Sequence, residues 1–242
     1  MSRRPDAEVV PSGAPVSDLG ELQRRLGYDF SDADLLDLAL THRSVSGRRN
    51  NERLEFLGDA FLGYVAAAEL FERHADAKEN QLTLLRASLV RGRTLAELAR
   101  AIGLGEFLRL GSGELKSGGH RRDSILADAV EAVIGAVLLD GGQESARTVV
   151  VGLLGDRLER ARPGEVRKDP KTRLQEWLQG RGEALPEYEV AQVAGSDHAQ
   201  TFTVICRVPA LGEPISGRGR SRRAAEQQAA SHALDLLGGE GE

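Results

Sequence analysis

The hydrophobic pattern of this chain changes abruptly at residues 162–165, which read Arg-Pro-Gly-Glu. On the N-terminal side, from about residue 18, apolar residues recur three and four positions apart, as at Leu35, Leu38 and Ala39. This spacing is typical of amphipathic helices. On the C-terminal side, polar and apolar residues alternate as they do in strands. A chain of 242 residues that changes its pattern in this way is long enough for a medium-sized domain followed by a small one.

We therefore predict an all-α N-terminal domain and a small α+β C-terminal domain. The predicted divisions are a flexible tail over 1–17, the helical domain over 18–162, a linker over 163–168 and the small domain over 169–238. The small domain has the predicted order helix, strand, strand, strand, helix, at residues 172–180, 188–193, 200–208, 214–217 and 221–237.

Composition narrows the class of protein. Hydrophobic residues make up 40% of the chain, which is enough for a core, and no apolar run approaches the roughly 18 residues of a membrane helix. The Arg-rich start has no apolar signal-peptide region, so we expect a soluble, cytoplasmic protein without a membrane partner. The single cysteine, Cys206, excludes an internal disulfide framework and a Cys-based zinc cluster.

Three acidic residues share one face of a predicted helix at 51–60. Glu55 and Asp59 are four positions apart and Glu52 precedes Glu55 by three, so all three fall within an arc of about 60°. Leu54 and Leu57 lie on another face, which would supply the core contact. This segment alone fits a solvated acidic stripe on an amphipathic helix equally well.

A second predicted helix, at 124–139, has only two charges, Asp128 and Glu131, in an otherwise apolar run that should be buried. These acids share a face with small residues such as Ala132 and Gly135, which allow another helix or a ligand to approach closely. Buried carboxylates need a basic partner, a proton or a bound cation. The run itself contains no basic residue, although one could reach in from elsewhere. Two facing helices with acids would form an oxygen-only site for Mg²⁺ or Mn²⁺, which best matches metal-assisted hydrolysis of a phosphodiester.

Both acidic segments resemble motifs of the ribonuclease III family. Residues 51–59, Asn-Glu-Arg-Leu-Glu-Phe-Leu-Gly-Asp, resemble the family signature, and residues 128–132, Asp-Ala-Val-Glu-Ala, resemble its second acidic motif. Residues 41–44, Thr-His-Arg-Ser, are also typical of bacterial members. The similarity extends from about residue 19 to residue 237 and includes both predicted domains in the family's order.

The resemblance implies roles for individual residues. Glu131 would be central to catalysis, while Glu52 and Glu79 would be accessory acids. Phe56 would lie at the dimer interface and insert into the partner subunit of a homodimer. The implied catalytic acids, which would also be the metal ligands, are Glu55, Asp59, Asp128 and Glu131.

A cluster of arginines precedes the last predicted helix. The whole chain has a net charge of −5 and the region from Lys168 has nine Lys and Arg against eleven Asp and Glu, but binding depends on where cations cluster. Residues 217–223 include four arginines, with no acid between Glu213 and Glu226. Because a helix start exposes backbone N–H groups that favour anions, we predict a phosphate-binding site there. The alternative is an ordinary solvated basic turn.

The order helix, three strands, helix, with this basic entry to the last helix, resembles the double-stranded RNA-binding domain. Such domains grip A-form RNA through 2′-hydroxyl and phosphate contacts across two minor grooves. The resemblance implies contacts from the first helix, from the loop between the first two strands and from the start of the last helix. The residues at these places are Gln175, Glu176, His198, Arg220, Arg222 and Arg223.

The sequence thus predicts a homodimeric, Mg²⁺-dependent endoribonuclease that cleaves double-stranded RNA, with Mn²⁺ as a substitute ion. By resemblance, it would leave 5′-phosphate and 3′-hydroxyl ends on precursor rRNA and structured mRNA. One alternative is a non-catalytic regulator that binds double-stranded RNA, which the intact acid set disfavours. Another is a helical metal–carboxylate enzyme for a small molecule, which leaves the C-terminal domain without a purpose.

Overall fold

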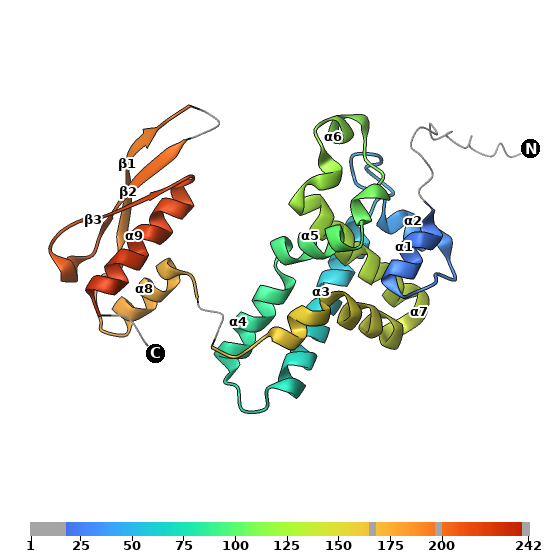
Figure 1. The fold of residues 1–242 in the computed structure, drawn as a ribbon, viewed down its shortest axis with the longest axis horizontal. Helices are drawn as coiled ribbons and strands as arrows, with labels where there is room; N and C mark the ends of the chain where they lie inside the picture. The colour runs from blue at the N-terminus through green and yellow to red at the C-terminus, as the bar shows by residue number, and fades with distance from the viewer. Residues whose placement is uncertain (1–17, 165–167, 197–199, 239–242) are drawn as a thin grey trace, which may run out of the picture. The chain divides into compact units, whose positions relative to one another are not determined.

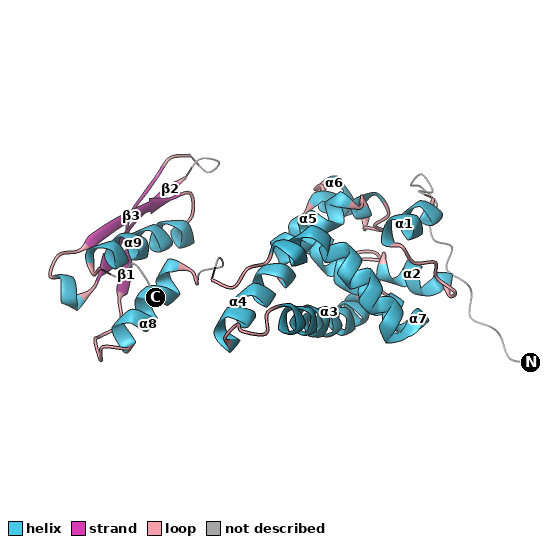
Figure 2. Ribbon diagram, turned by 60° about the horizontal axis from the view of Figure 1, so that its bottom comes forward, coloured by secondary structure: helices cyan, strands magenta, loops and turns pink. Residues whose placement is uncertain are grey.

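The computed structural model describes residues 18–164, 168–196 and 200–238. The chain forms two compact units that divide between residues 166 and 167, inside the predicted linker. The first unit is helical, and the strands lie in the second (Figure 1 and Figure 2). The predicted tail at 1–17 lies outside the described residues, and the domain limits 18–162 and 169–238 remain a prediction. No helix in the described ranges is long and apolar enough to span a membrane.

The main helix pair of the first unit is α3 and α7; α2 and α5 pack against α7, and α4 packs against α3. The longest helix, α7, is interrupted at Gly142 and Gly155, where the backbone leaves the helical conformation. The helices are α1 (Leu19–Leu26), α2 (Ala33–Ala39), α3 (Glu52–Arg73), α4 (Glu79–Val90), α5 (Gly92–Ala101), α6 (Ser112–Lys116) and α7 (Asp123–Arg160), with 3₁₀ turns at Leu104–Glu106 and Gly119–Arg121.

Two glycines allow α3 and α7 to cross in direct contact. A Cβ atom on Gly58 would lie 1.7 Å from the backbone oxygen of Glu131, and one on Gly135 would lie 2.2 Å from that of Leu54. Any larger residue would separate the two helices at this crossing. The buried face of α3 therefore includes Gly58, and Leu57, which we expected on the core face, is only half-buried.

The second unit is an antiparallel sheet in the order β1-β2-β3 that shares a core with two helices. The alternation predicted for the second strand is confirmed, since Val204, Cys206 and Val208 are buried. Its elements are α8 (Pro170–Gln179), β1 (Glu187–Ala194), β2 (Thr201–Arg207), β3 (Ile215–Gly219) and α9 (Arg222–Leu236).

Candidate active site

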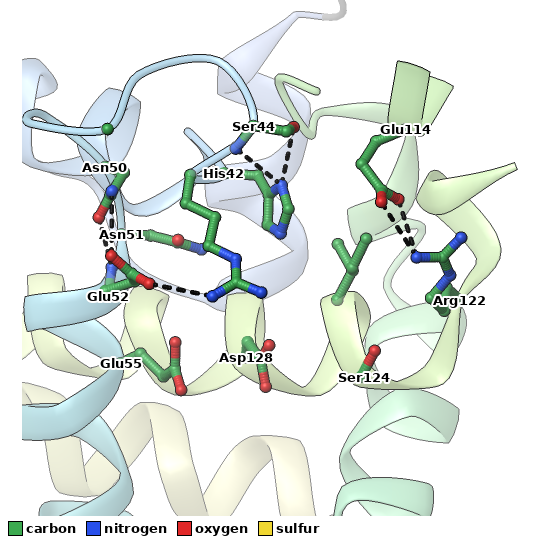
Figure 3. A pocket seen from close by; sticks show the side chains of 13 residues that line it. His42, Ser44, Asn50, Asn51, Glu52, Glu55, Glu114, Arg122, Ser124 and Asp128 are labelled. Atoms are coloured by element: carbon green, nitrogen blue, oxygen red, sulfur yellow. Dashed lines mark hydrogen bonds and ion pairs between the residues drawn. The ribbon is translucent and has the colours of Figure 1, made fainter. Parts of the chain in front are cut away.

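The α3–α7 crossing brings three acids together. Glu55 lies in the first turns of α3, and Asp128 and Glu131 lie in the first turns of α7. Each offers a carboxylate oxygen, and the three oxygens all lie within 4.8 Å of one another. Figure 3 shows Glu55 and Asp128 beside each other below the loop that holds His42. We call Glu55, Asp128 and Glu131 the acid cluster.

Burial and mutual repulsion favour the protonated forms of these acids. Burial, and then the charges of Asp59, Asp128 and Glu55, raise the pKa of Glu131 to about 8. Burial also raises the pKa of Glu55 and of Asp128. All three side chains are half-buried, although the apolar run predicted that Asp128 and Glu131 would be fully buried. Glu55 and Asp128 line a pocket.

No base among the described residues is paired with the acid cluster. Within the described ranges, no side chain donates a hydrogen bond to Glu55, Asp128 or Glu131 or forms an ion pair with them. His42 and then Arg43 lower the pKa of Asp128, and Arg43 lowers that of Glu55, which partly opposes the effect of burial. The ion pair of Arg43, however, is with Glu52. Oxygen-only ligands on two rigid helices fit a hard divalent cation such as Mg²⁺.

Two further acids of the predicted set lie at the edge of the acid cluster. Asp59 is exposed, and it is not among the three residues whose oxygens converge, although its charge raises the pKa of Glu131 and Glu55. Glu52 is the first residue of α3. Its carboxylate accepts a hydrogen bond from Asn50 Nδ2 at 3.1 Å and lies 3.6 Å from Arg43 Nη1.

Glu79, the second predicted accessory acid, is not brought to the acid cluster within one chain. It is the first residue of α4, which follows the far end of α3. The 22 residues of α3 span about 30 Å. The Glu79 carboxylate instead accepts a hydrogen bond from Thr83 Oγ1 at 2.8 Å.

A pocket of about 800 Å³ lies beside the acid cluster. Glu55 and Asp128 line it, together with basic residues that the sequence argument gave no role, namely His42, Arg43 and Arg122 (Figure 3 labels His42 and Arg122). The Thr-His-Arg-Ser motif at 41–44 was the available signal for two of these residues.

Backbone hydrogen bonds fix the loop that carries His42. The His42 N–H donates to the carbonyl of Arg109 at 3.0 Å, and the Arg109 N–H donates to the carbonyl of Leu40 at 2.9 Å. At the other end of the loop, the Asn51 N–H donates to the carbonyl of Thr41 at 2.9 Å. The loop is therefore anchored to the start of α3, which keeps its basic side chains at the pocket.

The predicted RNA contacts in the second unit lie on exposed positions. Gln175 and Glu176 are exposed on α8. The three arginines predicted to meet phosphates are also exposed, and they lie where β3 passes into α9. Ser221 caps α9 by accepting a hydrogen bond from the Ala224 N–H at 3.1 Å. The last predicted contact, His198, lies outside the described residues.

Comparisons with known proteins cover both units. A family model described as Ribonuclease-III-like matches residues 32–157, and one described as Double-stranded RNA binding motif matches residues 170–237. Ribonuclease 3 of Alcanivorax borkumensis is 59% identical over 220 residues, which cover 91% of this chain and 96% of that protein. The chain belongs to the ribonuclease III family.

Further relatives of this ribonuclease III agree. Ribonuclease 3 of Vibrio atlanticus is 55% identical over 221 residues, which cover 91% of this chain and 98% of that protein. The nuclease domain of ribonuclease III from Campylobacter jejuni superposes with a TM-score of 0.57 at 42% identity, over 58% of this chain and 98% of that domain. The predicted fold is thus confirmed, with an all-α endonuclease domain followed by an α-β-β-β-α double-stranded RNA-binding domain.

Membership makes this chain an endoribonuclease of double-stranded RNA that depends on a divalent metal ion. The comparisons give no support to a non-catalytic RNA-binding regulator.

Proposed function

We propose that this ribonuclease III hydrolyses double-stranded RNA with Mg²⁺ held by Glu55, Asp128 and Glu131, and that Asp59 completes the set of metal-binding acids. The observation that supports this is the convergence of three carboxylate oxygens within 4.8 Å, with no basic side chain of the described ranges paired to them. Mn²⁺ would substitute for Mg²⁺. The products would be 5′-phosphate and 3′-hydroxyl ends on precursor rRNA and structured mRNA in the cytoplasm.

A divalent cation bound here would neutralise phosphate charge and lower the pKa of a water nucleophile. The protein's contribution is position and charge. The direct contact of α3 and α7 at Gly58 and Gly135 fixes the spacing of the acids. The raised pKa of Glu131 keeps it protonated near neutral pH, so cation binding there would release a proton. Arg43 provides positive charge at the pocket, which His42 also lines, and an RNA phosphate would approach there.

The RNA-binding domain would hold the duplex by contacts that do not depend on sequence. Gln175 and Glu176 of α8 would meet one minor groove and His198 a second one. The phosphates between them would be met by Arg220, Arg222 and Arg223 at the start of α9.

We also propose a homodimer through the exposed aromatic face of α3. Phe56 is 79% exposed, Tyr64 67% and Phe71 71%, and an apolar face of this kind marks an interaction surface. The solved structure from Campylobacter jejuni is described as having a region involved in dimer formation. Because Glu79 lies beyond the far end of α3, an accessory role for it in the acid cluster requires the partner subunit.

The dimer is tested by light scattering on size-exclusion fractions. We expect Phe56→Ala to shift the protein toward the monomer at low micromolar concentration. The matched control is Leu139→Ala, which removes an exposed apolar side chain from α7 instead of α3 and should leave the dimer intact. An unchanged dimer in Phe56→Ala would exclude this residue as an interface anchor.

The nuclease activity is tested on a long RNA duplex with Mg²⁺ and then with chelator. We expect cleavage only with Mg²⁺, loss of cleavage in Glu131→Ala with RNA binding retained, and normal cleavage in Glu159→Ala, an exposed acid at the far end of the same helix. Mapping the ends of a cut hairpin checks the 5′-phosphate and 3′-hydroxyl assignment. If Glu131→Ala still cuts, the assignment of the metal site is wrong.

A further inference from the structure

A buried glutamate lies one helical turn after Arg222, near the start of α9. Glu226 is only 8% exposed, and its two carboxylate oxygens have different partners. Lys171 Nζ of α8 donates to Oε2 at 2.6 Å, and Arg222 Nε donates to Oε1 at 2.8 Å. Burial alone would raise the pKa of Glu226, but the hydrogen bonds from Lys171 and Arg222 hold it below its ordinary value. Glu226 is therefore a charged acceptor for both bases.

The bond to Glu226 uses only one edge of the Arg222 guanidinium. The described contacts of Arg222 are made through Nε, and its side chain remains 64% exposed. Its two terminal amino groups are thus available to a phosphate, which guanidinium groups bind in a bidentate fashion. The side chain of the neighbouring Arg223 is exposed and forms no hydrogen bond or ion pair within the described part of the chain. Arg222 is held before RNA arrives and Arg223 is not, so Arg222 loses less side-chain entropy on binding.

The same turn of α9 is tied to the start of α8. Gln227 Oε1 accepts a hydrogen bond from the Lys171 N–H at 3.1 Å, and Gln227 Nε2 donates to Asp169 Oδ1 at 2.7 Å. Lys171 Nζ also lies 4.3 Å from the centre of the Tyr188 ring. Two successive residues of α9, Glu226 and Gln227, therefore fix the start of α8 relative to the start of α9.

We propose that Glu226 is a positioning residue for RNA binding, which holds Arg222 toward a phosphate and, through Lys171, sets the distance between the phosphate contact and the minor-groove contact of α8. This inference rests on the proposed function, because it takes Arg222 to be a phosphate contact. Domains of this kind recognise the spacing of grooves and phosphates. A fixed distance between the two helix starts is therefore what such recognition requires.

Whether Glu226→Gln strengthens or weakens RNA binding distinguishes a positioning role from a purely electrostatic effect of the Glu226 charge. Glu226→Gln removes a negative charge beside a phosphate site, which by electrostatics alone would tighten RNA binding. If Glu226 positions Arg222, the same change weakens binding, by about fivefold. The plot of log affinity against log salt concentration should also become less steep in Glu226→Gln. Arg222→Ala should change it in the same direction, lowering the magnitude of its slope by about one.

The experiment is a pair of double-substitution cycles on the full-length protein, with a short RNA duplex in chelator and the RNA checked intact on a gel. In the cycle with Arg222→Ala, we expect Glu226→Gln to cause a smaller loss in affinity than it causes alone, and the part that remains is the part that acts through Lys171. In the matched cycle with Arg223→Ala, the two losses should multiply. A merely structural role for Glu226 would affect both cycles alike.

Circular dichroism and the thermal midpoint report whether the RNA-binding domain stays folded. If Glu226→Gln unfolds it, the conservative Glu226→Asp is measured in the same cycles. Unchanged or tighter binding in the Glu226 variant, or equal coupling to Arg222 and Arg223, overturns the proposal. If Arg222→Ala and Arg223→Ala both leave affinity unchanged, the proposed phosphate contacts fail, and the positioning role fails with them.

Discussion

The helices α3 and α7 carry carboxylates at two places, Glu69 and the acid cluster, and the two places differ in whether a basic side chain is paired with the carboxylate. Toward the end of α3, the buried Glu69 accepts hydrogen bonds from Arg147 of α7, at 2.7 Å from Nη2, and from Arg73, at 3.1 Å from Nη2. The hydrogen bond from Arg147 outweighs burial, and with Arg73 it lowers the pKa of Glu69. Near the starts of α3 and α7, the acid cluster has no such partner among the described residues, and the pKa of Glu131 is raised to about 8.

This difference separates a structural acid from a functional one. The same helix pair supplies guanidinium groups at one end, so a missing base at the other end is not a property of these helices in general. A carboxylate left unpaired and half-buried destabilises the metal-free fold. Such a cost persists where a site needs the unpaired groups. Under the proposed function, the acid cluster differs from Glu69 because its positive partner is a bound metal ion rather than an arginine.

The largest expected difference between the two sites is in cleavage. Glu131→Gln should reduce single-turnover cleavage of an RNA duplex by about 10³-fold, because it removes one charged ligand of the proposed metal site. Glu69→Gln should cleave at a normal rate per folded molecule. Equal losses in the two variants would show that both acids act only through the fold.

The next effect is on stability, and it should occur at Glu69. Glu69→Gln leaves two guanidinium groups without their carboxylate and should lower the free energy of unfolding by about 2 kcal/mol. Urea unfolding followed by far-UV circular dichroism, in chelator at pH 7, measures this. If Glu69→Gln is as stable as the unsubstituted protein, the arginine pairs of Glu69 do not stabilise the fold, and the contrast with the acid cluster fails.

A smaller effect of opposite sign is expected at Glu131. Between pH 4.5 and about 8, the unfolded chain loses the Glu131 proton while the folded chain retains it. The free energy of unfolding of the metal-free protein therefore decreases as pH rises through this window. Glu131→Gln removes this dependence and should be more stable than the unsubstituted protein by about 1 kcal/mol at pH 8. The same urea series over pH measures it, and a less stable Glu131→Gln at pH 8 would contradict the assignment.

The smallest effect is expected at the exposed edge of the acid cluster. Glu52 pairs with Arg43 in contact with solvent, and such pairs contribute about 0.5 kcal/mol. Glu52→Gln should therefore leave stability within about 0.5 kcal/mol and reduce cleavage only about threefold, because Arg43 loses its partner at the pocket. Metal affinity should not change. A loss of metal affinity would make Glu52 a ligand rather than a neighbour of the ligands.

How far the sequence could predict this site depends on the distance between its parts along the chain. The three-residue spacing of Asp128 and Glu131 on an apolar helix, with Gly135 a turn away, was sufficient to predict an acidic face against another helix. The approach of Arg43 was not predictable from that pattern, because it depends on backbone hydrogen bonds between its loop and Arg109.

Long-range partners were likewise outside the reach of periodicity. Glu69 and Arg147 are 78 residues apart, and Lys171 and Glu226 are 55 apart. Helical spacing places Glu226 on the same face of its helix as Ala229, Ala230 and Ala233, but it does not show that Lys171 packs against that face. Helical periodicity gives the face of a residue but not which distant side chain packs against that face.

In the proposed site, a divalent cation takes the place at the acid cluster that arginine takes at Glu69. The most direct test is calorimetric titration of Mn²⁺ into the RNA-free protein near pH 7, in two buffers with different ionisation enthalpies. Because Glu131 is protonated at this pH, we expect binding to release up to about one proton, and Glu131→Gln to lose both the proton release and most of the affinity. Equal binding by the protein and by Glu131→Gln, with no proton released from either, would contradict the account.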